Sequence, residues 1–171
     1  MKKVLFIIAH EGYQPVEYSA SKKILENGDV KVVTASNKEG VATSSINQQR
    51  ADVDLSLEKV NAGDYDGIFF IGGPGAPDHL DNKESYRIIR EVAASGKPWG
   101  AICISPRILA KAGVLSGKKA TGWDGDNELG KILHDTGAEY VREPVVVDGN
   151  LITANGPSAA EEWGRKILEK L

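Results

Sequence analysis

Two patterns of hydrophobic positions alternate along this chain. Short stretches are apolar at nearly every position, which is typical of strands buried on both faces of a parallel sheet. Between them, apolar residues recur every three or four positions, which is typical of helices that cover a sheet. The first pattern predicts strands over residues 3–9, 30–35, 67–71 and 98–102. The second predicts helices over residues 16–26, 86–94, 128–135 and 158–171, and another directly after Cys103.

The segments between these elements are less regular. Residues 36–57 are mostly polar and favour an excursion with short strands over a regular helix. A short strand is expected near residues 119–122, and Asp148-Gly149 between two apolar runs predicts a β-hairpin. Because strands and helices alternate over residues 1–171 without a linker or repeat, we expect one α/β domain. Its central sheet should be mostly parallel, with helices on both faces.

Composition and charge exclude several classes of protein. The 171 residues are 41% hydrophobic and 26% charged, as in ordinary globular chains. A net charge of −3 gives no electrostatic footprint for nucleic acid or an anionic membrane. The apolar run near the N-terminus is too short to span a membrane and predicts a strand rather than a signal peptide. One cysteine permits no internal disulfide, which agrees with a cytoplasmic location.

The single cysteine, Cys103, lies between a predicted strand and a predicted helix. Pro106 suits the first turn of that helix, where its missing N–H group costs nothing. The pattern therefore predicts a tight strand-to-helix turn that exposes the thiol. A helix N-terminus beside it would favour the thiolate through its partial positive charge. The alternative is a buried structural cysteine.

Ligands of parallel sheets bind at the carboxyl ends of the strands. That edge should gather residues 10–17, the glycine-rich turn at residues 72–77, Cys103 and Trp123. Backbone N–H groups of the turn could stabilise an oxyanion, and Glu17 could transfer protons beside the thiol. The alternatives are a simple tight turn and a glutamate that faces solvent.

Metal and phosphate-loop sites are not expected. The three histidines, His10, His79 and His134, lack the spacing of metal ligands. The turn at residues 72–75 has neither the spacing of a dinucleotide-binding loop nor a following Gly-Lys-Ser/Thr sequence. Chemistry at this edge would therefore depend on the chain's own side chains.

Four segments resemble the DJ-1/PfpI (ThiJ) family, in the same order along the chain. They are residues 4–17, 65–73, 101–115 around the cysteine, and 148–157. Together they span nearly the whole chain. The resemblance implies a flavodoxin-like three-layer sandwich with a nucleophile elbow, which usually forms a homodimer or a larger homo-oligomer.

The resemblance also implies roles for individual residues. Cys103 would be the nucleophile, Glu17 its acid–base partner, and the backbone N–H groups of Gly73 and Ile104 the oxyanion donors. Family members are described as cofactor-free glyoxalases, deglycases, intracellular proteases or redox-responsive chaperones. For this chain the resemblance favours a glyoxalase or deglycase-like enzyme that acts on a small carbonyl compound without a cofactor or metal. A cysteine peptidase and a redox-sensing, chaperone-like stress protein are the alternatives.

Some positions depart from the family pattern. Protease-like members carry a histidine directly after the cysteine, where this chain has Ile104, and this argues against a peptidase. His79 is the candidate to replace that histidine within the chain. The expected substrate pocket includes His10, Gly72, Trp123 and Asn155.

Overall fold

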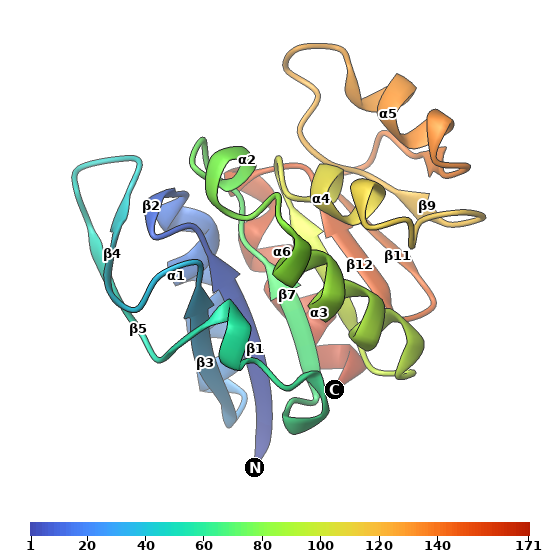
Figure 1. Cartoon of the computed structure of the whole chain (residues 1–171). Coiled ribbons are helices and arrows are strands. Elements are labelled where there is room, and N and C mark those ends of the chain that lie inside the picture. Colours follow the sequence, from blue (N-terminus) through green and yellow to red (C-terminus); the bar gives the residue numbers. More distant parts are fainter.

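A computed structural model describes residues 1–171 as a three-layer α/β sandwich (Figure 1). The central sheet has seven strands. In order across the sheet they are β11 (Val145–Asp148), β12 (Leu151–Ala154), β8 (Trp99–Ile102), β7 (Gly67–Phe70), β1 (Lys2–Ile8), β3 (Val30–Ser36) and β6 (Leu55–Ser56). All neighbours are parallel except the β11–β12 hairpin. The predicted α/β sandwich with a mostly parallel sheet is therefore confirmed.

Helices cover both faces of the sheet. They are α1 (Pro15–Asn27), α2 (Ala76–His79), α3 (Lys83–Ala94), α4 (Pro106–Lys111), α5 (Leu129–Asp135) and α6 (Ala160–Lys170). Helices α1 and α6 pack over the face to which β1 contributes Val4 and Phe6. Helices α3 and α4 pack over the other face, to which β1 contributes Leu5 and Ile7. From Val4 onward both faces of β1 are buried, which explains why residues 4–8 are all apolar.

The polar segment after β3 forms the expected short strands. Strands β4 (Gly40–Ser44) and β5 (Arg50–Val53) make an antiparallel hairpin. Strand β4 also pairs in parallel with β2 (Glu11–Tyr13), which follows β1. This small sheet lies at one side of the molecule, next to the turn that leads from β1 into α1 (Figure 1).

Two predicted details differ in the structure. The strand expected near residues 119–122 is only β9 (Lys119–Ala120), and it pairs with β10 (Glu139–Tyr140) outside the main sheet. The turn of the β11–β12 hairpin is Gly149-Asn150, because Asp148 still pairs with Leu151. Gly149 has a φ of 60°, which a two-residue hairpin turn of this kind requires.

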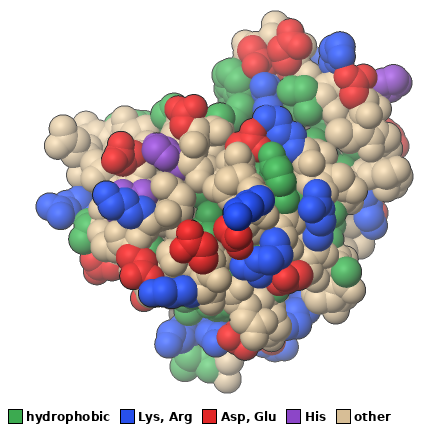
Figure 2. All heavy atoms as spheres, in the orientation of Figure 1, with side chains coloured by type: hydrophobic (Ala, Val, Ile, Leu, Met, Phe, Trp, Pro, Cys, Tyr) green, Lys and Arg blue, Asp and Glu red, His purple; other side chains and the backbone are tan.

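The molecular surface has no single-sign charged face in the view of Figure 2. Acidic and basic side chains are intermingled there. Over the whole molecule several of them form exposed ion pairs, such as Lys59–Glu39 and Arg165–Glu161. No helix of the chain combines the length and the apolar character needed to cross a bilayer.

Candidate active site

Cys103 occupies the turn between β8 and α4. Its φ of 62° lies in the left-handed region, which a residue with a side chain adopts only when its surroundings impose it. The Cys103 N–H group donates to the carbonyl oxygen of Ala154 at 2.9 Å, and its own carbonyl accepts from the Trp123 N–H at 2.7 Å. The Ser105 hydroxyl donates to the carbonyl of Ile71 at 2.7 Å. These bonds fix the predicted strand-to-helix elbow between β7, β8 and β12.

Glu17 lies in the first turn of α1 and is completely buried. The side chain of Gln14 caps this helix, since its oxygen accepts the N–H groups of Val16 at 2.6 Å and Glu17 at 3.0 Å. The Glu17 Oε2 atom accepts the N–H of Gly72 at 2.8 Å, whereas Oε1 is buried without such a bond. The alternative of a glutamate that faces solvent is therefore wrong.

Gly72 lies between the thiol and the carboxyl group. A Cβ atom at this position would come within 2.7 Å of both the Cys103 Cβ and the Glu17 Oε2. Gly73 has a φ of 114°, and a Cβ there would lie 2.4 Å from the carbonyl oxygen of Gly12. The glycine pair is therefore what allows the turns after β1, β7 and β8 to approach one another this closely.

The thiol and the carboxyl group change each other's pKa. Burial raises the pKa of Glu17 to about 7, and the Cys103 contact and the Gly72 N–H only partly offset this. Burial, followed by the charge and contact of Glu17, raises the pKa of the Cys103 thiol, while the N–H groups of Ile104 and Gly73 act to lower it. Burial and Glu17 outweigh these N–H groups, so the pKa of the thiol is raised overall. This is contrary to the expectation that the helix N-terminus would favour the thiolate.

Because of this coupling, the protonation state of Glu17 determines how favourable a Cys103 thiolate is. Protonation of Glu17 removes the negative charge beside the sulfur and supplies an O–H donor. The pair then carries one negative charge, which the N–H groups of Gly73 and Ile104 can stabilise on the sulfur. A single proton shared between Glu17 and Cys103 can thus move as the charge at the site changes.

Cys103 opens into a cavity of about 310 Å³. The residues that line it are Gln14, Gly73, Pro74, Pro77, Cys103, Ile104 and Trp123. Prolines, isoleucine and tryptophan make most of the wall, and the thiol is half-buried at its base. Glu17 does not line the cavity. A small molecule in the cavity would meet the sulfur directly.

An arginine on α4 holds the Trp123 wall in place. The Arg107 guanidinium makes two hydrogen bonds to Asp126, at 2.7 and 2.9 Å, and one to the Trp123 carbonyl at 3.2 Å. Its centre also lies 5.3 Å from the centroid of the Trp123 ring. The exposed indole is therefore tied to the helix that follows the cysteine.

The structure brings most of the expected site residues together. The thiol cavity includes Cys103, Gly73, Ile104 and Trp123, and Gly72 and Glu17 lie directly against the thiol. Gln14, Pro74 and Pro77 fall within the ranges 10–17 and 72–77 expected at this edge, but the expected pocket did not name them individually. The sequence signals that point to them are a glutamine before a proline at a helix start and two prolines in a glycine-rich turn.

Two of the expected pocket residues lie elsewhere. Asn155 lines a separate polar cavity of about 430 Å³ that shares only Trp123 with the first. His10 does not line the thiol cavity either, and its Nδ1 is buried without a hydrogen-bond partner. His79 is also absent from that wall, so no imidazole borders the Cys103 cavity. Nowhere do three His, Cys, Asp or Glu side chains group as a metal site would require.

Comparison with known proteins identifies the family of this chain. The sequence model of the DJ-1/PfpI family matches residues 2–170. The chain belongs to the DJ-1/PfpI family. It is 34% identical to a protein named deglycase from Pyrococcus horikoshii and 32% identical to the deglycase PfpI of Pyrococcus furiosus, in each case over 99% of both chains.

Solved structures of DJ-1/PfpI members have the same fold. A ThiJ/PfpI domain protein from Brachyspira murdochii superposes with a TM-score of 0.91 at 26% identity, covering 98% of this chain and 94% of the other. DJ-1beta of Drosophila melanogaster superposes with a TM-score of 0.88 at 32% identity, covering 99% and 90%. The predicted flavodoxin-like DJ-1/PfpI fold is therefore confirmed along the whole chain.

Proposed function

We propose that this protein is a cofactor-independent glyoxalase or deglycase-like enzyme that acts on small 2-oxoaldehydes or their adducts. The observation that carries the proposal is the pair formed by Glu17 and Cys103. A fully buried carboxyl group with a pKa of about 7 lies against a thiol that opens into a small cavity. Full-length relatives that are named deglycases support the same class of chemistry.

The first step is nucleophilic attack at the aldehyde. The Cys103 sulfur forms a bond to the aldehyde carbon, and the carbonyl electrons move onto oxygen. The N–H groups of Gly73 and Ile104, which already point at the sulfur, would stabilise that oxyanion. The proton of Glu17 then passes to the oxyanion, which gives a neutral hemithioacetal and leaves Glu17 as a carboxylate.

The second step moves a proton between adjacent carbons. The Glu17 carboxylate takes the proton from the former aldehyde carbon, which leaves an enediolate. The hydroxyl proton moves from the former aldehyde oxygen to the former ketone oxygen, and Glu17 returns its proton to the former ketone carbon. One carbon is oxidised to a thioester and its neighbour is reduced to an alcohol, so no external redox partner is required. Water then cleaves the carbon–sulfur bond, releases the hydroxy acid and restores the Cys103 thiol. A base with a pKa near neutrality suits this role.

The peptidase alternative has less support in this chain. A cysteine peptidase uses an imidazole as general base beside the thiol. Ile104 takes the position of that residue, and the cavity wall contains no histidine. The cavity is also close to the lower limit of about 300 Å³ for ligand pockets, which favours a small carbonyl compound.

The proposal is tested by single-turnover release of lactate from methylglyoxal. Glu17→Gln keeps the shape of the side chain but cannot carry the proton, so release should be about 10²–10⁴-fold slower. Intact mass should still detect the covalent adduct in this variant, whereas Cys103→Ser should form none. Glu26→Gln, at an exposed position on the same helix, should behave as wild type. Equal lactate release by Glu17→Gln and wild type would reject the mechanism.

A further inference from the structure

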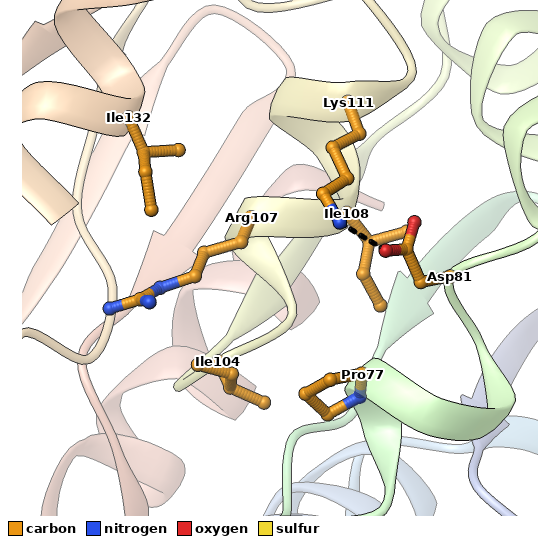
Figure 3. Close-up of a pocket in the computed structure, with 7 residues that line it drawn as sticks. All are labelled: Pro77, Asp81, Ile104, Arg107, Ile108, Lys111 and Ile132. Carbon is orange, nitrogen blue, oxygen red and sulfur yellow. Dashed lines mark hydrogen bonds and ion pairs between the residues drawn. The ribbon is translucent and has the colours of Figure 1, made fainter. Parts of the chain in front are cut away.

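A second cavity of about 260 Å³ lies beside the thiol cavity (Figure 3). Its walls come from α2 and the turn after it, from α4 and α5, and from the residue after the cysteine. Pro77 and Ile104 line both cavities, and Figure 3 shows these two side chains close together along one side. The two cavities are therefore neighbours that share an apolar wall next to Cys103.

The charged groups of the second cavity already have partners. Lys111 forms an ion pair with Asp81, and the Arg107 side chain extends in the opposite direction (Figure 3). Its guanidinium binds Asp126. An incoming anion would compete with both aspartates, so the cavity has no free positive charge to attract it. What remains available to a ligand is mostly aliphatic surface, from Pro77, Ile104, Ile108 and Ile132. One polar group is also unpaired, because the Arg107 Nε is buried without a hydrogen-bond partner.

The volumes of the two cavities also favour a ligand with an apolar part in the second cavity. Each cavity alone is near or below the lower limit of about 300 Å³ for ligand pockets, whereas the two together fall within the range. A ligand that fills both needs a reactive head at Cys103 and an apolar substituent that passes Ile104. A 2-oxoaldehyde with only a methyl group would leave the second cavity empty.

We infer that the second cavity is a subsite for an uncharged aryl or branched-alkyl substituent of the substrate. The enzyme would then prefer 2-oxoaldehydes with a bulky apolar group over methylglyoxal. The identity of the reactive head rests on the proposed function, whereas the subsite itself rests on the cavity walls. Ile104 has a specific role in this inference, because it contributes an apolar side chain to both compartments.

Binding can be tested without any chemistry at the cysteine. Acetophenone has the aryl ketone but no aldehyde, and acetone has only the methyl ketone. In protein labelled at isoleucine methyl groups, NMR should show acetophenone shifting the signals of Ile108 and Ile132 at concentrations where acetone does not. Ile24 of α1, on the opposite face of the sheet, serves as the internal reference. Absence of a selective shift at Ile108 and Ile132 would overturn the subsite, whether or not the protein is active.

Kinetics provide the second test. Ile132 lines the second cavity but not the first, so Ile132→Trp should fill the subsite and leave the thiol cavity open. The kcat/KM for phenylglyoxal should fall about 10-fold or more, while that for methylglyoxal stays the same. Lys131→Trp, on the same helix with a side chain 74% exposed, is the matched control and should change neither value.

The outcomes separate the subsite from the proposed reaction. An equal loss with both aldehydes in Ile132→Trp, or no loss with either, would overturn the subsite. Turnover of methylglyoxal without the acetophenone shifts would reject the subsite and retain the enzyme. Selective shifts in a protein that turns over neither aldehyde would support the subsite and reject the glyoxalase.

Discussion

Burial of the Glu17 carboxyl group should make the stability of this protein depend on pH. The side chain is fully buried, and its pKa is raised from an ordinary value of 4.5 to about 7. Between these two pH values the folded protein holds the Glu17 proton, whereas the unfolded chain releases it. Stability contributed by this protonated group is therefore present at low pH and is lost as the pH rises towards 7.

The magnitude follows from the two pKa values. At about 1.4 kcal/mol per pKa unit, the difference between 4.5 and about 7 corresponds to ~3 kcal/mol. Glu17→Gln stays neutral throughout and can still accept the Gly72 N–H, so the variant avoids this loss. Relative to wild type, its free energy of unfolding should increase by ~3 kcal/mol between pH 4.5 and pH 7.5.

Urea unfolding at these two pH values and constant ionic strength measures the effect. Titrating groups that do not contact Glu17 are common to both proteins and cancel in the comparison. Glu26→Gln is the control, because the Glu26 side chain is 50% exposed on the same helix, and its difference from wild type should hardly depend on pH. If the difference between Glu17→Gln and wild type is the same at pH 4.5 and pH 7.5, Glu17 does not have a raised pKa.

Further predictions concern the contacts around Glu17. Glu17→Gln should shift alkylation of Cys103 by iodoacetamide to lower pH, because the carboxylate raises the thiol pKa; an unchanged pH profile would contradict the coupling. Gly72→Ala should cost about 1–3 kcal/mol in urea unfolding, whereas Gly156→Ala, which has open space, should not. Mild peroxide should convert Cys103 to a sulfinate in intact-mass spectra; sulfonate or intermolecular disulfide alone would argue against a stabilising carboxyl neighbour.

Local sequence patterns located most of the elements but not all of their ends. The apolar run of β1 and the amphipathic spacing of α3 are both visible within about ten residues. Yet α3 begins at Lys83, three residues before its apolar stripe predicts. The side chain of Asn82 accepts the Ser85 N–H at 3.0 Å, so a cap rather than hydrophobic spacing sets that boundary.

The amino-acid sequence by itself determined which residues follow which strands. Cys103, Glu17 and the glycine turn come after separate parallel strands, so they had to lie at one edge of the sheet. Hydrophobic periodicity and the succession of elements along the chain are properties of neighbouring residues, which is why this much can be read without a structure.

Only the tertiary structure decided how these residues act together. The Glu17 carboxyl group meets the N–H of Gly72 across 55 positions of the chain, and its burial depends on every segment packed around it. The same packing raised the pKa of Cys103 against the helix terminus and left His10 and Asn155 outside the thiol cavity. Distances and desolvation are properties of the whole fold, because residues remote in sequence together exclude water from the site.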